Sequence, residues 1–127
     1  MLQQTINYLD DLIAFPSVSS DSNLDLIAYV EQALKAAGAR TVRTHDADGG
    51  KANVFGTIGP DVDGGVVLSG HTDVVPVAGQ NWSADPFTAL HRDGRIYGRG
   101  SCDMKGFIAA ALDMAKQVTR RVKALPW

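Results

Sequence analysis

The stretch Gly65-Val66-Val67-Leu68-Ser69-Gly70-His71-Thr72-Asp73 decides the fold class of this 127-residue chain. Its first half is a short continuous apolar run, which is typical of a strand buried on both faces of a sheet. The polar residues His71 and Asp73 follow this run directly. Ligands of α/β sheets gather just beyond the carboxyl ends of the strands. We therefore expect a buried strand here, with a functional site at its end.

Helical and strand-like patterns alternate on both sides of this stretch. Apolar residues at helical spacing predict three helices, over residues 2–13, 24–38 and 104–123. Ser22 is the expected N-cap of the second helix, and Gly38 its expected end. Strand patterns cover residues 41–44, 52–58 and 90–97, the last as a hairpin with an Asp93-Gly94 type I′ turn. This interleaving predicts an α/β fold, a mixed and mostly parallel sheet flanked by helices.

Composition and charge exclude several classes of protein. Lys and Arg number 12 against 14 Asp and Glu, a net charge of −2, which argues against a nucleic-acid-binding surface and a polybasic membrane patch. The single cysteine, Cys102, excludes an internal disulfide and a cysteine-based zinc finger. No signal peptide and no apolar run near the roughly 18 residues of a membrane span is found. We expect one mildly acidic domain located in the cytoplasm.

The pair His71 and Asp73 is the first candidate for chemistry. Side chains two residues apart on extended backbone point to the same side. An imidazole held by a neighbouring carboxylate is the usual arrangement of a metal-binding histidine. The alternative is a capped strand end with a solvated aspartate, because a His-x-Asp pattern alone is a weak signal.

The glycine-rich stretch 98–106 is the second candidate. Its glycines form neither a dinucleotide fingerprint nor a phosphate-binding loop. Asp103 is either the N-cap of the last helix or a carboxylate that bridges two metal ions. Cys102 is expected to be a small buried thiol, since a nucleophile would need a histidine base and none is near in sequence. Lys105 is expected in solvent or against an anion.

Taken together, three segments resemble the acetylornithine deacetylase/succinyl-diaminopimelate desuccinylase family of co-catalytic zinc hydrolases. These segments are residues 69–76, 82–87 and 93–106. The order of the segments along the chain also matches, together with the opening helix and residues 15–19. The amino-acid sequence of residues 101–107 is most similar to that of the acetylornithine deacetylase branch.

The resemblance implies roles for three residues. His71 is expected to bind one zinc ion, and Asp103 to bridge two zinc ions, with a cis peptide bond after it. Asp73 is expected to orient His71 and to support catalysis. The resemblance implies zinc as the cofactor, two ions per complete site; cobalt and manganese also suit His and Asp ligands. In the family, a metal-bound water attacks the amide and a glutamate is the general base.

The family's Glu-Glu pair would follow the last helix, where this sequence stops at Trp127. Residues 1–127 are therefore expected to be the N-terminal portion of the catalytic domain, without the small dimerisation domain. The family also implies a homodimer in the full-length protein. We expect residues 1–127 alone to be inactive. Their exposed sheet edge is expected to cause self-association.

The activity that the resemblance implies is hydrolysis of N-acetyl-L-ornithine to L-ornithine and acetate, in arginine biosynthesis. Desuccinylation of succinyl-diaminopimelate, or hydrolysis of another N-acyl amino acid, is the alternative within the family. A non-catalytic module that binds a partner or copies of itself is the alternative from another class. A cysteine hydrolase that uses Cys102 is the weakest alternative.

Overall fold

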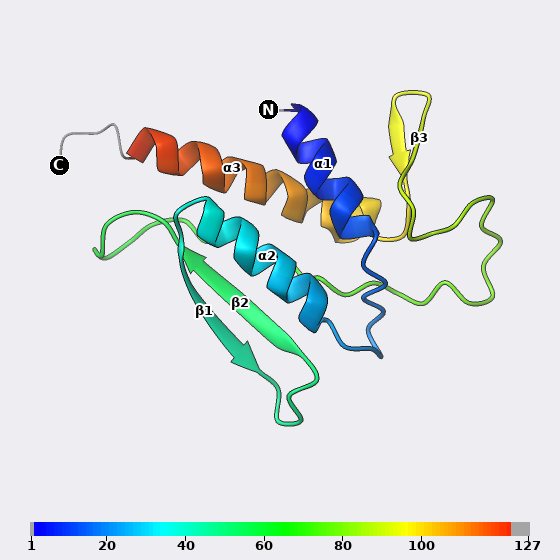
Figure 1. Cartoon of the computed structure of the whole chain (residues 1–127), viewed down its shortest axis with the longest axis horizontal. Helices are drawn as coiled ribbons and strands as arrows, with labels where there is room; N and C mark the ends of the chain where they lie inside the picture. The colour runs from blue at the N-terminus through cyan, green and yellow to red at the C-terminus, as the bar shows by residue number, and fades with distance from the viewer. Residues whose placement is uncertain (1, 123–127) are drawn as a thin grey trace.

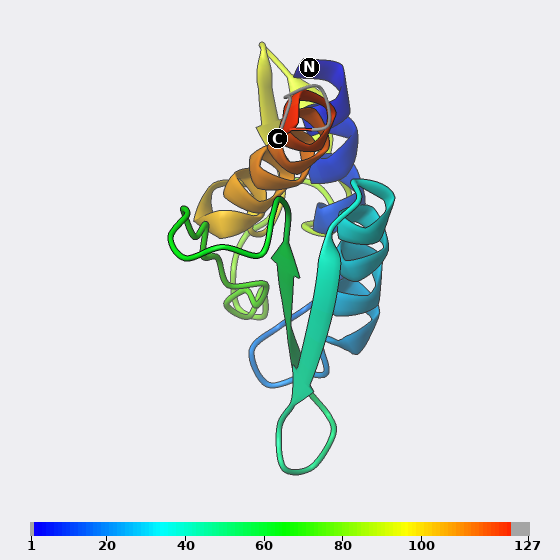
Figure 2. The ribbon, with the colours of Figure 1, turned by 90° about the vertical axis from the view of Figure 1, so that its left-hand side faces the viewer.

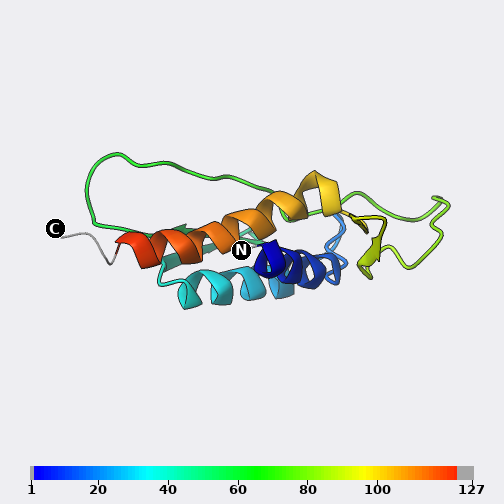
Figure 3. The ribbon, with the colours of Figure 1, turned by 90° about the horizontal axis from the view of Figure 1, so that it is seen from above.

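The computed structural model describes residues 2–122. The elements in chain order are α1 (Leu2–Ile13), α2 (Leu24–Ala36), β1 (Arg40–His45), β2 (Ala52–Thr57), β3 (Leu90–Arg92), β4 (Arg95–Tyr97), the π-helical turn η1 (Ser101–Lys105) and α3 (Gly106–Val122). The helices α1 and α2 both pack against α3 (Figure 1). The hairpin of β1 and β2 lies against α2 (Figure 2). The segment after β2 runs along the side of α3 opposite α1 and α2 (Figure 3).

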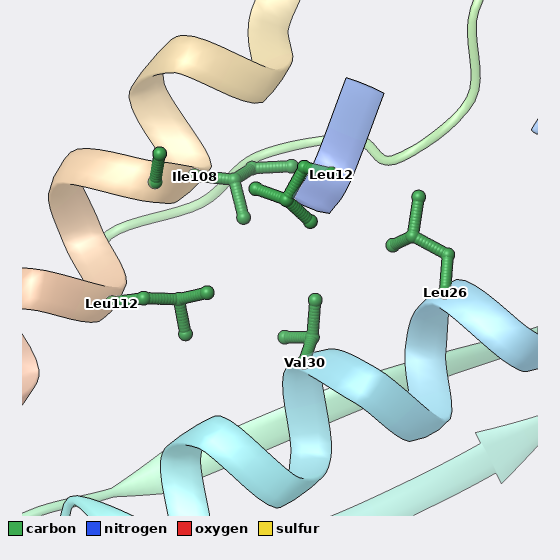
Figure 4. Packing of buried hydrophobic residues seen from close by; sticks show 6 residues of the cluster. Leu12, Leu26, Val30, Ile108 and Leu112 are labelled. Carbon is green, nitrogen blue, oxygen red and sulfur yellow. The ribbon is translucent and has the colours of Figure 1, made fainter. Parts of the chain in front are cut away.

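One apolar cluster joins the three helices (Figure 4). Its buried members are Leu12, Leu26, Val30, Ile108, Ala109 and Leu112. Leu26 and Val30 of α2 are four residues apart, as are Ile108 and Leu112 of α3, so that each pair lies on one face of its helix. Full burial of a leucine side chain is worth roughly 1.5–3 kcal/mol, so this cluster stabilises the packing of the three helices.

The predicted helices are confirmed, with differences at their ends. Gly38 has φ +88° and follows α2 as predicted. The N-cap of α2 is Asn23 rather than Ser22, and it makes no side-chain cap hydrogen bond. The reason is that the Asn23 side chain is bonded instead to the backbone of Ala52, at 3.0 and 2.9 Å. The helix predicted from Met104 begins at Gly106 because the backbone is kinked at Asp103 and Met104.

The predicted end of that helix at Lys123 and the strand approach at residues 124–127 lie outside the described residues.

The strands predicted at residues 41–44 and 52–58 form, and so does the hairpin predicted at residues 90–97. β1 and β2 are antiparallel, with registers from Arg40–Thr57 to His45–Ala52. β3 and β4 are antiparallel and joined by Asp93 (φ +53°) and Gly94 (φ +71°), the two positive φ angles of the predicted type I′ turn. The mixture of helices and strands confirms the α/β class.

The expected parallel sheet is wrong for residues 2–122. The two sheets in this part of the chain are two-stranded and antiparallel, and its parallel pairing is the single bridge between Val18 and Val74. Residues 65–69 form no strand, and Val66 and Val67 are 89% and 70% exposed. A strand buried on both faces needs neighbours for its N–H and C=O groups, and the described residues place none beside this run.

No helix within residues 2–122 is both long enough and apolar enough to cross a membrane.

Candidate metal centre

His71 lies between two carboxylates. Its Nδ1 is 3.1 Å from Oδ1 of Asp73, and its Nε2 is 3.0 Å from Oδ1 of Asp103. Nδ1 is also 3.1 Å from the Asp73 carbonyl oxygen. Each ring nitrogen therefore has one carboxylate partner. The structure brings together all three residues that the sequence singled out, although 32 positions separate His71 from Asp103.

The turn that carries Asp103 lies close to the loop that carries His71. The peptide bond between Asp103 and Met104 is cis, as the family resemblance implied. The His71 amide also donates to Sδ of Met104 at 3.4 Å. Gly100 has φ +81°, and a side chain there would meet Val74 at 2.7 Å. The glycine lets the turn before Asp103 approach the loop that carries His71.

A second loop holds Asp73 from the other side. The hydroxyl of Ser19 donates to Oδ2 of Asp73 at 2.5 Å. The backbones of the two loops are linked by hydrogen bonds from Ser19 N to Val74 O (3.0 Å) and from Val74 N to Ser17 O (2.9 Å). The carboxylate that faces His71 is thus fixed at both of its oxygens.

These contacts shift the pKa values of the site. The hydrogen bond from Ser19 lowers the pKa of Asp73, and the charge of His71 adds to that effect. Burial lowers the pKa of His71, but hydrogen bonds to the Asp73 carbonyl and the Asp103 carboxylate outweigh it and raise the pKa overall. Both shifts favour the charged form of the group concerned.

The donor atoms also fit a metal ion. Two atoms that each lie about 2.0–2.2 Å from one zinc ion are at most about 4.4 Å apart. Nε2 of His71 and Oδ1 of Asp103, 3.0 Å apart, can therefore bind the same ion. Asp73 faces the other ring nitrogen, the position from which a carboxylate fixes the tautomer of a metal-binding histidine. Residues 2–122 contain no group of three or more His, Cys, Asp or Glu placed to hold an ion.

A cleft of about 210 Å³ opens over these residues. Its polar lining comes from the loops described above and from the turn that precedes α3. The residues concerned are Ser19, His71, Asp73, Arg99, Ser101, Cys102 and Asp103. Half of the His71 side chain and 84% of the Asp103 side chain remain exposed. A small ligand can therefore reach both candidate metal-binding atoms.

The structure excludes one alternative left open by the sequence and corrects two expectations. Asp103 is not an N-cap, because it lies in the kink of η1 with its carboxylate directed at His71. Cys102 is exposed rather than buried. Lys105 is fully buried rather than solvated, and its ammonium donates to the Phe15 carbonyl oxygen at 2.7 Å. Burial lowers the pKa of Lys105 to about 8.

Sequence reasoning missed Ser19 and the structural role of Lys105. Residues 17–20 are predicted only as a loop, since serines after a proline carry no periodic signal. The position of Lys105 two residues after Asp103 was visible, but the buried carbonyl that accepts its hydrogen bond lies 90 positions away. Only the tertiary structure shows both contacts.

Comparisons with known proteins agree with this geometry. Residues 67–125 match the model of peptidase family M20/M25/M40. The chain is 40% identical over 114 residues to an acetylornithine deacetylase of Shigella sonnei, covering 84% of this chain and 30% of that protein. It is 41% identical over 123 residues to a succinyl-diaminopimelate desuccinylase of Rickettsia felis, covering 90% of this chain and 32% of that protein. The chain thus spans about a third of the length of these relatives.

The fold has a solved counterpart. The crystal structure of human carnosine dipeptidase 1 superposes with a TM-score of 0.78 over 94% of this chain and 29% of that chain, at 23% sequence identity. This similarity supports the α/β fold.

Proposed function

We propose that the whole protein is a metal-dependent amidohydrolase acting on N-acylated amino acids, a proposal supported by the match of residues 67–125 to the model of peptidase family M20/M25/M40. The single observation that carries the proposal is His71, fixed by Asp73 at Nδ1 and facing Asp103 at Nε2. A metal-binding histidine needs this division between its two nitrogens. The relatives with about 40% identity are named for such hydrolyses.

The residues of this chain have distinct tasks in the proposed reaction. His71 and Asp103 would hold the ion, and the second oxygen of Asp103 would be free for a second ion. With an ion on Nε2, Asp73 would keep the proton of the imidazole on Nδ1. A divalent cation bound here would polarise the amide carbonyl and lower the pKa of bound water. Zinc is the proposed cofactor, two ions per complete site, with cobalt able to replace it.

The general base of this reaction has to come from elsewhere in the whole protein. The one glutamate of this chain, Glu31, lies in α2 and is bonded to Lys35, Thr41 and Arg43. A catalytic zinc ion usually has three protein ligands, whereas His71 and Asp103 supply two. We therefore propose that the 127-residue chain is inactive alone, as the N-terminal portion of a catalytic domain. A homodimeric whole protein in the cytoplasm remains a prediction.

We propose N-acetyl-L-ornithine as the substrate, with L-ornithine and acetate as products, in arginine biosynthesis. The amino-acid sequence of residues 101–107 supports this choice. So does the similarity to an acetylornithine deacetylase of Pasteurella multocida, which is 40% identical over 123 residues. The desuccinylase relative has nearly the same identity and makes succinyl-diaminopimelate the second candidate. Both substrates are N-acyl amino acids whose amide bond is hydrolysed.

The test is hydrolysis by the whole protein loaded with zinc. N-acetyl-L-ornithine, N-succinyl-diaminopimelate and a plain N-acetyl amino acid would be compared by release of the free amine. We expect the first to be hydrolysed fastest. His71→Ala should lose at least about 100-fold in rate, because loss of an outer partner of a metal ligand already costs about 10- to 100-fold and loss of the ligand should cost more. His45→Ala is the matched control, because His45 is an exposed residue at the end of β1.

Hydrolysis of none of the three substrates would contradict the proposal and favour a non-catalytic binding module. Faster hydrolysis of the succinyl substrate would move the assignment to the alternative within the family. A Cys102→Ala variant that retains hydrolysis would eliminate the cysteine hydrolase. Both ring nitrogens of His71 already face carboxylates, which disfavours its use as a base for Cys102.

A further inference from the structure

We propose that Ser19 is a positioning residue of the metal centre, which fixes the Asp73 carboxylate and through it the ring of His71. The proposal rests on the proposed function, since it assigns a task within that site. The two oxygens of Asp73 are divided between two partners. Oδ2 accepts the hydrogen bond of the Ser19 hydroxyl at 2.5 Å, and Oδ1 lies 3.1 Å from Nδ1 of His71.

The backbone holds the Ser19 hydroxyl in this place. Val18 and Val74 form a parallel bridge, and the Ser19 amide donates to the Val74 carbonyl oxygen at 3.0 Å. The Val74 amide donates back to Ser17 at 2.9 Å. The hydroxyl of Ser17, which is 3% exposed, donates to Thr72 at 2.7 Å. Ser19 is therefore held beside Asp73 by hydrogen bonds on both sides of it.

The same loop is tied to the segment that carries Asp103. The ammonium of Lys105, two residues after Asp103, donates to the Phe15 carbonyl oxygen at 2.7 Å. Lys51 donates to the Ser19 carbonyl oxygen. The loop of residues 15–19 thus contacts both flanks of the candidate metal centre, and Ser19 is its one side chain bonded to a carboxylate of that centre.

The physical consequence follows from the freedom of a carboxylate. An aspartate bonded at one oxygen only can rotate, so that either oxygen, or neither, faces the imidazole. The hydrogen bond from Ser19 selects one orientation and keeps the Nδ1 proton of His71 opposite Oδ1. Removing a partner in the second layer of a metal site typically lowers metal affinity or activity by 10- to 100-fold.

The chain offers a matched control on the same loop. Ser20 is also exposed, and its hydroxyl donates to the neighbouring Asp21 at 3.0 Å rather than to the metal centre. Ser20→Ala removes an equivalent group from the adjacent position. Ser19→Thr keeps a hydroxyl at the position itself, where exposure leaves room for a methyl group.

The experiment measures zinc affinity of the whole protein by competition with a chromophoric chelator. We expect about 10- to 100-fold weaker binding in Ser19→Ala, with affinity restored to within about 3-fold by Ser19→Thr and unchanged in Ser20→Ala. In an Asp73→Asn background, Ser19→Ala should have little further effect, because Ser19 acts through Asp73. Urea unfolding of each variant shows that the chain is folded.

A second readout is independent of hydrolysis. With zinc bound, the ¹⁵N signals of the His71 ring should show Nε2 as the ligand and a proton on Nδ1 in the parent. Ser19→Ala should show a second set of signals, from rings whose Nδ1 is not held by Asp73. Parent-like zinc affinity and a single tautomer in Ser19→Ala would overturn the inference.

The outcomes separate this inference from the proposed function. If the parent binds zinc through His71 and hydrolyses no N-acyl amino acid, the proposed function fails while the affinity and ¹⁵N results still judge Ser19. If the parent hydrolyses its substrate and Ser19→Ala behaves like Ser20→Ala, the inference fails while the function stands.

Discussion

Residues 65–69 and residues 70–74 are consecutive, yet they have opposite surroundings. Val66 is 89% exposed and Val67 is 70% exposed, whereas Val74 is 3% exposed and bonded to the loop of residues 17–19. The apolar half lacks partners in the described residues, and the polar half has several. The difference teaches that the candidate site is organised by hydrogen bonds between loops and by the helical core behind them, and not by the strand that the sequence predicts in front of it.

The largest expected effect tests the helical core against the exposed run. Leu12→Ala removes a side chain with 0% exposure from the cluster shared by α1, α2 and α3, and should lower the free energy of unfolding by roughly 2–5 kcal/mol. Urea unfolding measures this change. A loss below about 1 kcal/mol would mean that the helices do not form one packed core.

The next prediction concerns Lys105, the buried cation that ties the turn before α3 to the loop of residues 15–19. Burial lowers its pKa from 10.5 to about 8, so the unfolded chain binds more protons than the folded chain between these values. The free energy of unfolding should therefore rise with pH across this window, by up to about 3 kcal/mol from this group. Below about pH 8 the charge is present in both states, and its burial opposes folding in full.

The measurement is urea unfolding from neutral pH to above pH 10 for the parent and for Lys105→Met. The difference between the two curves isolates Lys105 from other groups that titrate there. An equal rise in both proteins would show that Lys105 is solvated and does not anchor the loop.

A smaller effect is expected at the surface between α2 and β1. Hydrogen bonds from Lys35, then Thr41 and Arg43, lower the pKa of Glu31 from 4.5 to about 2. The contribution of Glu31 to stability is therefore present above pH 4.5 and is lost as the pH falls towards 2. Glu31→Gln should show a shallower loss of stability over this acidic range than the parent. Identical acid unfolding curves would mean that this network does not hold the hairpin against α2.

The smallest effect on stability is expected in the exposed run itself. Val66→Thr combined with Val67→Thr should change the free energy of unfolding by less than about 0.5 kcal/mol, since both side chains lie in solvent. The same change should reduce self-association of the chain, because contiguous exposed apolar groups promote it. Sedimentation velocity would measure the mass distribution. A large loss of stability would show that the run is packed, against the structure.

Local patterns predicted most of the elements. The helical spacing of residues 2–13 and 24–34 gave helices at the right places, and Asp93-Gly94 gave the turn with two positive φ angles. The helix propensities of the residues could not predict the kink at Asp103, and only the family resemblance implied its cis peptide bond. The prediction of a parallel strand at residues 65–69 was wrong, because an apolar run indicates burial without indicating which element covers it.

The site was predictable in its residues and less so in its supports. His71, Asp73 and Asp103 were singled out, and the structure places them within hydrogen-bond distance. Ser19 and Lys105 were not predicted, because their partners Asp73 and Phe15 lie 54 and 90 positions away. Hydroxyl and ammonium groups carry no periodic signal that would reveal such contacts.

The most direct test of the central claim is to titrate the ¹⁵N-histidine-labelled chain with zinc, beside His71→Ala and Asp103→Asn. We predict that zinc shifts the Nε2 signal of His71 while Nδ1 keeps its proton, and that either variant weakens or abolishes binding. A zinc-induced shift at Nδ1 of His71, or zinc binding that is unchanged in both variants, would contradict the assignment of His71 and Asp103 as ligands of one ion.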